Sequence, residues 1–133
     1  MMRVVRARPE GRKPSAESYP PPGTTGPSSS SIFIGEATVQ TVVGDEWTRD
    51  LRMVEVHFKD GARNRMHTHT TDQILVITEG TAMVGTQTEK HELAVGDVAL
   101  IPSGEEHWHG AKPGHDMTHL AITGHGSQTK LAD

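Results

Sequence analysis

Two stretches decide the fold: residues 61–80, Gly61-Ala-Arg-Asn-Arg-Met-His67-Thr-His69-Thr-Thr-Asp-Gln73-Ile-Leu-Val-Ile-Thr-Glu-Gly80, and residues 96–109, Gly96-Asp-Val-Ala-Leu-Ile-Pro102-Ser-Gly104-Glu-Glu-His107-Trp-His109. In an extended strand, residues two apart face the same side, so His67 and His69 present two imidazoles to one face. His107 and His109 repeat this spacing, and Gln73 keeps the same parity at the start of an apolar run. Two such pairs, each framed by Gly or Pro, predict a metal site built on strands.

The sequence around these stretches consists of short apolar or alternating runs rich in Val, Ile and Thr. Turn-forming residues separate the runs at about the 8 to 12 residue spacing of an antiparallel sandwich or barrel. No stretch shows a sustained period of 3.6, so we expect little helix. The predicted strands lie within 31–43, 50–58, 73–80, 81–87, 90–95, 97–103, 105–111 and 117–124.

Both stretches resemble the two motifs of the cupin superfamily. The first matches from Gly61 to Gly80 except that Gln73 replaces a glutamate, and the second matches from Gly96 to His107, with Ala111 where asparagine is usual. The resemblance covers about 32–124. It implies an all-β fold, a small single-domain jelly-roll barrel.

The same resemblance implies one divalent metal ion bound by His67, His69, Gln73 and His107. Manganese is the first expectation, and Fe, Ni, Co, Cu or Zn are alternatives. Three neutral imidazoles and a neutral amide would leave the metal its full charge of +2, which favours the divalent state and Lewis-acid chemistry. The alternative is that Gln73 only lies near the metal and water takes its position.

A longer match runs from His107 to Ile122. Together with the His-x-His and Gln pattern, it resembles the small manganese-dependent hydroxynitrile lyases of the cupin type, and single-domain cupins associated with carboxymuconolactone decarboxylase. The resemblance implies that His119 is the acid or base beside the metal and that His109 is a further pocket histidine. From the residues alone, His119 lies on an alternating strand, and a hydrogen-bonded core histidine is the other interpretation.

Three functions follow as expectations. The first is a metal-dependent enzyme for a small molecule, with lyase chemistry on a cyanohydrin-like or hydroxy-carbonyl compound. The second is an oxygenase (a dioxygenase-like cupin) with a redox metal, which the neutral Gln73 disfavours. The third is a cupin that binds a small ligand without catalysis.

Composition narrows the classes of partner. The chain has 13 basic and 17 acidic side chains and a formal net charge of −4, so a phosphate-binding nucleic-acid surface is not expected. The chain has no cysteine and nine histidines, so a metal must bind through imidazole, carboxylate, amide or water. No apolar run is long enough to cross a membrane, and no secretory signal is evident, which predicts a cytoplasmic protein.

We divide the chain into a flexible N-terminal arm over 1–31, the barrel over 32–124 and a polar C-terminal tail over 125–133. The pair Val4 and Val5 could add a strand to a sheet edge. The run 74–77 is apolar on both faces and needs cover on both, so we expect a homodimer.

Side chains outside the motifs receive weaker interpretations. Odd numbering places Arg63 and Arg65 on the side of His67, where they could bind an anionic substrate, although a solvent-facing role is the alternative. We expect His57 to be hydrogen-bonded or exposed, and Trp108 to face away from the metal. Glu105 and Glu106 precede His107 in a turn and could orient it, although an ordinary pair of turn residues is the favoured interpretation.

Overall fold

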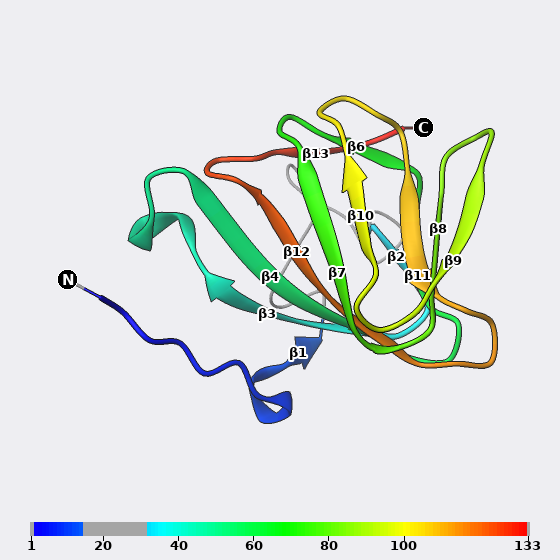
Figure 1. Cartoon of the computed structure of the whole chain (residues 1–133), viewed down its shortest axis with the longest axis horizontal. Helices are drawn as coiled ribbons and strands as arrows, with labels where there is room; N and C mark the ends of the chain where they lie inside the picture. Colours follow the sequence, from blue (N-terminus) through cyan, green and yellow to red (C-terminus); the bar gives the residue numbers. More distant parts are fainter. Residues whose placement is uncertain (1, 15–31, 133) are drawn as a thin grey trace.

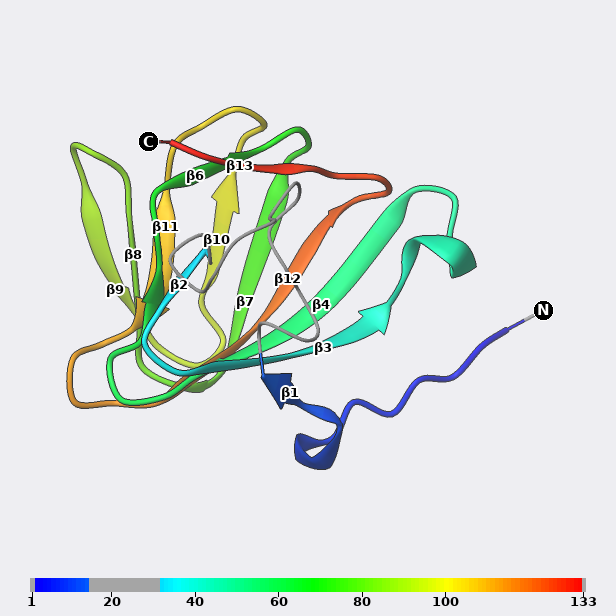
Figure 2. The ribbon, with the colours of Figure 1, turned by 180° about the vertical axis from the view of Figure 1, so that it is seen from behind.

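The computed structural model describes residues 2–14 and 32–132, and in that part the chain forms two facing antiparallel sheets and a short two-stranded ribbon (Figures 1 and 2). This confirms the all-β jelly-roll prediction. The only helical elements in the described part are single 3-10 turns, η1 (Pro9–Gly11) and η3 (Asp45–Trp47), so no helix there could span a membrane. The strands are β1 (Lys13–Pro14), β2 (Phe33–Ile34), β3 (Ala37–Val43), β4 (Leu51–Phe58), β5 (Arg63–Asn64), β6 (His67–His69), β7 (Gln73–Gly80), β8 (Ala82–Gly85), β9 (Lys90–Leu93), β10 (Val98–Ile101), β11 (Trp108–Ala111), β12 (Met117–Gly124) and β13 (Thr129–Leu131).

The larger sheet has the strand order β1-β3-β4-β12-β7-β10, and the smaller has the order β2-β5-β11-β8-β9. Strand β6 pairs with β13 and also meets the start of β11 through a bridge between His67 and His107. The two histidine motifs are therefore neighbours in space. This arrangement brings residues some forty positions apart in the sequence to one end of the barrel.

Strict alternation on the long strands builds the core between the sheets. On β4, Val54, Val56 and Phe58 are buried, and the residues between them are only partly covered. The same period of two fills the interior from the neighbouring strands, where Leu75 of β7 and Met117 of β12 are completely buried. The larger sheet therefore supplies most of the apolar wall that surrounds the histidines.

Gly80 closes β7 at a point where only glycine fits. Its φ is +74°, and an added Cβ would collide with the backbone carbonyl of Asp116. Any other residue would be strained in this left-handed backbone conformation, and its Cβ would also clash with Asp116. The last glycine of the first motif thus keeps the 80–82 turn packed against the loop before β12.

The ends of the chain differ from the sequence-based expectation. Within 125–133, expected to be a polar tail, Thr129–Leu131 forms strand β13 and pairs with β6. Three alternating residues are too few to give a periodic signal, which is why the strand was not predicted. At the other end, Lys13 and Pro14 pair with the edge of β3, whereas Val4 and Val5 form no strand. Residues 15–31 of the predicted arm lie outside the described part.

Candidate metal centre

Three histidines converge at one end of the barrel. His67 and His69 project inward from β6, and His107 stands opposite His67, with two backbone hydrogen bonds of 2.9 and 3.0 Å joining these two residues. All three side chains are buried. Their potential ligand atoms lie within 4.8 Å of one another. The predicted His-x-His pair and the predicted His107 therefore form one cluster that could hold a metal ion.

Each imidazole in this cluster is oriented by a partner on its outer nitrogen. His67 Nδ1 donates to the carbonyl oxygen of Arg65 at 2.6 Å, and His107 Nδ1 donates to that of Glu105 at 2.9 Å. His69 Nδ1 lies 3.0 Å from Thr129 Oγ1. A proton on Nδ1 leaves a lone pair on Nε2, so the ring presents a ligand atom. Glu105 orients His107 through its backbone and not through its carboxylate.

Burial keeps these rings neutral. Desolvation, and then the proximity of His107, lowers the pKa of His67 to about 3 and that of His69 to about 4. Desolvation likewise lowers the pKa of His107. Neutral imidazole is the form that binds a metal, since the charged ring has no lone pair to offer.

Two contacts show that the donor set fits a divalent cation. His69 Nε2 is buried and makes no hydrogen bond. Gln73 Oε1 lies 3.1 Å from His107 Nε2, and because the Nδ1 proton of His107 is already donated to Glu105, this contact brings two lone pairs together. A cation among these atoms would satisfy both features. His67, His69 and His107 thus form a cluster that could hold a metal ion, and the role of Gln73 as a fourth ligand stays a prediction.

A second pair of histidines lies deeper in the same interior. His119 projects inward from β12, and its Nε2 lies 2.8 Å from Nδ1 of His109 on β11. Both side chains are buried, and desolvation lowers the pKa of His119 to about 4 and that of His109 well below its ordinary value. His119 Nδ1 has no hydrogen-bond partner. The pair is therefore neutral, with one ring nitrogen available to a ligand.

One cavity connects both groups. It encloses about 470 Å³ of space, counting its opening to solvent, and its wall includes His67, His69, Gln73, His109 and His119. Apolar side chains from β2, β4 and β12 form much of the remaining lining. A small molecule held there would touch His67, His69, Gln73 and His119 at once, because these side chains line the same space.

The structure corrects the position of Arg63. It lies on the outer side of the barrel with its guanidinium 4.0 Å above the ring of Trp108, while Asn64 points inward. Residues between β5 and β6 interrupt the alternation, so odd numbering does not carry over from His67 to Arg63.

As predicted, Trp108 faces away from the metal cluster, and His57 is hydrogen-bonded, with its Nδ1 2.7 Å from Thr118 Oγ1.

Sequence reasoning missed three residues of the site. Asn64 accepts the backbone N–H of His109 at 2.9 Å, and Thr129 contacts His69 from the C-terminal strand. Arg52 lines the cavity and is held by Asp45 and by the carbonyl oxygen of Ser127. Arg52 is two residues before buried Val54 on β4, so the alternation of that strand would have placed it inward. Nothing in the sequence pointed to Asn64 or Thr129.

The family model described as "Cupin domain" matches residues 54–123, which carry both histidine groups. This chain belongs to the cupin family. Among solved structures, a cupin-like protein from Thermotoga maritima is 30% identical, with a TM-score of 0.72 over 82% of this cupin and 84% of that chain. The polyketide cyclase RemF from Streptomyces resistomycificus has a TM-score of 0.74 at 18% identity, over 100% of this cupin and 87% of that chain, which shows a shared fold.

Two curated relatives carry functional names. An (R)-mandelonitrile lyase from Granulicella tundricola is 44% identical over 68 residues, which cover 50% of this cupin and 52% of the relative. The pectin degradation protein KdgF from Dickeya dadantii is 35% identical over 83 residues, covering 56% of this cupin and 76% of the relative. The match thus spans about half of the lyase.

Proposed function

We propose that this cupin is a divalent-metal lyase that cleaves a small hydroxy compound, with a cyanohydrin such as mandelonitrile as the first candidate. The observation that carries the proposal is that buried, neutral His119 shares one cavity with His67 and His69 of the histidine cluster. The partial match to an (R)-mandelonitrile lyase supports the choice of substrate.

In this proposal the metal is held by His67, His69, Gln73 and His107, with Mn(II) first among the candidates. When bound, the ion supplies a Lewis acid that polarises a hydroxyl oxygen or a cyanide, and the neutral donors leave it its full charge of +2. The apolar side of the cavity, including Val54 and Val56, receives the organic group of the substrate and excludes water.

His119 moves the proton. With its Nε2 proton donated to His109 Nδ1, His119 keeps a lone pair on Nδ1 and accepts the hydroxyl proton of the cyanohydrin there. The bond between the hydroxyl-bearing carbon and the nitrile carbon breaks, which yields an aldehyde and cyanide. His119 then returns the proton to cyanide, so the products are the aldehyde and hydrogen cyanide.

A second candidate substrate is a hydroxy-carbonyl compound. The match to KdgF, a protein named for pectin degradation, favours it, since it covers 76% of that relative. The same residues would serve this reaction, with His119 taking a proton from a hydroxyl group or from the carbon beside a carbonyl.

The test is cyanide release from mandelonitrile by protein loaded separately with Mn(II), Fe(II) and Zn(II). We expect metal-dependent release that falls by about 100-fold or more in His119→Ala, as for loss of a positioned acid or base, with metal content unchanged. The matched control His91→Ala removes an exposed imidazole on β9 and should retain activity. Release that persists in His119→Ala contradicts the role of His119, and no release with any metal contradicts the cyanohydrin proposal.

A further inference from the structure

One wall of the cavity carries a row of polar side chains near the start of β4. Strands β4, β12 and β7 lie side by side in the larger sheet (Figure 1). Their register pairs Arg52 with Thr123 and Thr123 with Gln73, and all three side chains line the cavity. Since neighbouring strands are about 4.8 Å apart, the Cα atoms of Arg52 and Gln73 are separated by roughly 10 Å. Arg52 therefore lies beside the predicted fourth ligand of the metal centre.

Arg52 gives this cavity a positive charge. Among the described residues that form the cavity wall, Arg52 is the one with a formal charge, because the histidines there are neutral and no aspartate or glutamate takes part. A divalent metal with neutral donors would add a charge of +2 to the same space. The cavity therefore attracts a ligand with a negative charge and repels a cationic one.

The guanidinium of Arg52 is held in place by two segments outside the cavity wall. Its Nε donates to Asp45 Oδ1 at 3.1 Å and its Nη2 to Asp45 Oδ2 at 2.5 Å, while Nη1 donates to the carbonyl oxygen of Ser127 at 2.9 Å. Asp45 belongs to η3, and Ser127 lies between β12 and β13. The Asp45 side chain is 33% exposed, against 20% for Arg52, so water screens the charge of Asp45 more strongly. A guanidinium fixed in this way loses little conformational freedom when it binds a carboxylate.

The rows beyond Arg52 are apolar and lead to His119. In the register of β4 and β12, Val54 pairs with Ala121, and Val56 pairs with His119. These four side chains also line the cavity. The charged end of the cavity and the proposed proton acceptor therefore lie on the same wall, with an apolar strip between them.

We propose that Arg52 and Thr123 form an anion-binding subsite of the cavity, which receives a carboxylate group of the substrate. The planar guanidinium pairs with the carboxylate, and the hydroxyl of Thr123 donates a further hydrogen bond to it. The apolar part of the substrate packs on Val54 and Ala121. The substrate class is then a small hydroxy compound that carries both a carboxylate and an apolar group.

This substrate class rests on the lyase function proposed above, but the subsite is tested by binding alone. Mandelonitrile is neutral and would leave the subsite unused. Mandelate has the same hydroxyl and phenyl groups with a carboxylate in place of the nitrile, and mandelamide is its neutral analogue of similar shape. The pair of ligands therefore isolates the contribution of the negative charge.

The experiment is calorimetric titration of the full chain, loaded with Zn(II) to equal metal content in each variant, with mandelate and with mandelamide. We expect the wild type to bind mandelate more tightly, and Arg52→Gln to weaken mandelate binding by about 10-fold to 100-fold while mandelamide changes by less than about threefold. The matched control Arg49→Gln removes an exposed guanidinium and should bind both ligands as the wild type does. A wild type that binds mandelate no better than mandelamide, or an equal effect of Arg52→Gln on both ligands, overturns the proposal.

The same titration of the metal-free protein separates this proposal from the lyase function. We expect the dependence on Arg52 to persist there at lower affinity, whether or not any cyanohydrin is cleaved by the loaded protein. Loss of the Arg52 dependence in the metal-free protein would contradict a subsite formed by the chain itself.

Asp45→Asn keeps the proposal testable if Arg52→Gln does not fold. The substitution removes the competing carboxylate but leaves an amide oxygen to contact the guanidinium, so mandelate binding should become about threefold tighter or more, with mandelamide unchanged. Unchanged or weaker mandelate binding in Asp45→Asn would mean that Arg52 only ties η3 to the loop before β13, which rules the subsite out.

Discussion

Asn64 Oδ1 accepts the backbone N–H of His109 at 2.9 Å, and both residues are buried beside the cavity. The Asn64 amide nitrogen also lies 3.1 Å from His109 Nε2 and 3.2 Å from its Nδ1. Asn64 therefore holds β11 at the position where His109 meets His119. It acts on the proposed chemistry through His109, so it is a positioning residue.

Replacing Asn64 with alanine should destabilise the fold by about 1 to 3 kcal/mol, because the N–H of His109 loses its acceptor in a buried place. Urea unfolding monitored by tryptophan fluorescence measures this change. The exposed amide of Gln87 is the control, and Gln87→Ala should change the free energy of unfolding by less than about 0.5 kcal/mol. Equal effects of the two substitutions would remove the positioning role of Asn64.

Changing Gln73 to glutamate tests whether this side chain is a ligand. A carboxylate attracts a divalent ion more strongly than an amide oxygen, so Gln73→Glu should tighten metal binding by about tenfold or more, or about 1.4 kcal/mol. The lower charge left on the metal should at the same time reduce turnover. Competition with a chromogenic chelator gives the affinity. An unchanged affinity would mean that water takes the ligand position.

The clustering of His67, His69 and His107 could be predicted because these residues follow the alternation of single strands. His67 and His69 are two apart on β6, and His107 carries its own turn signal in the preceding Pro and Gly. The prediction failed where the alternation breaks. Arg63 lies on a separate strand from His67, so its parity carried no information about the face it occupies.

Strand β13 shows a different limit. Thr129 reaches His69 only because Thr129–Leu131 pairs with β6, and that pairing depends on the whole barrel being closed. A polar three-residue strand has no local signature, since tertiary contacts decide whether it forms. The position of Asn64 likewise becomes meaningful only when β5 and β11 are placed side by side.

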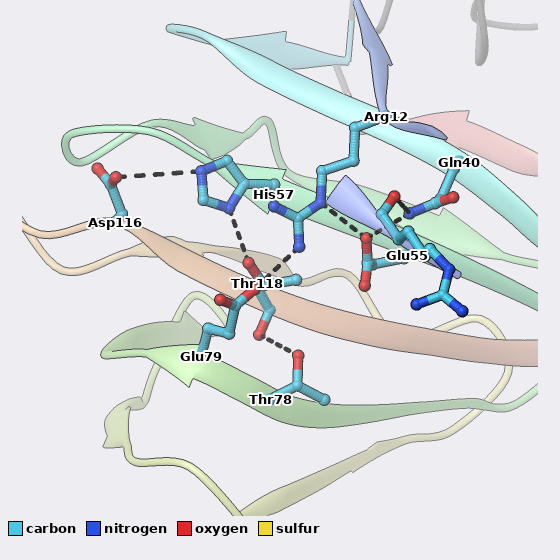
Figure 3. A network of polar contacts seen from close by, with 9 residues as sticks. Arg12, Gln40, Glu55, His57, Thr78, Glu79, Asp116 and Thr118 are labelled. Carbon is cyan, nitrogen blue, oxygen red and sulfur yellow. Dashed lines mark hydrogen bonds and ion pairs between the residues drawn. The ribbon is translucent and has the colours of Figure 1, made fainter. Parts of the chain in front are cut away.

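The attachment of the segment around Arg12 to the larger sheet should depend on the Arg12 side chain. The Arg12 side chain is 13% exposed and that of Glu55 12%, so Arg12→Ala leaves a largely buried carboxylate without its cation (Figure 3). We expect a loss of about 2 kcal/mol in stability, less than for a fully buried pair because the Glu79 side chain is 59% exposed. Limited proteolysis should then cut near residue 12 faster than in the control Arg8→Ala, where only an exposed side chain is removed. Equal cleavage rates would show that the β1 pairing with β3 holds the segment alone.

The stability of the metal-free protein should fall as the pH is lowered from about 6.5 to about 4. Burial lowers the pKa of His119 from 6.5 to about 4, so in this range the unfolded chain binds a proton that the folded chain excludes. The free energy of unfolding is highest above pH 6.5, the pKa of histidine in the unfolded chain. Below that pH it declines by about 1.4 kcal/mol per pH unit as the pH decreases. The buried imidazoles of the metal cluster add losses of the same sign.

His119→Asn removes this titration and isolates its contribution. Between pH 6.5 and pH 5, the variant should lose about 2 kcal/mol less of its unfolding free energy than the wild type does. Urea unfolding at the two pH values, with a chelator present because bound metal adds its own pH dependence, measures the difference. Exposed His91 is the control, and His91→Ala should follow the wild type. A His119→Asn curve parallel to the wild type would mean that His119 accepts a proton in the folded state, and would remove the basis for a neutral base in the cavity.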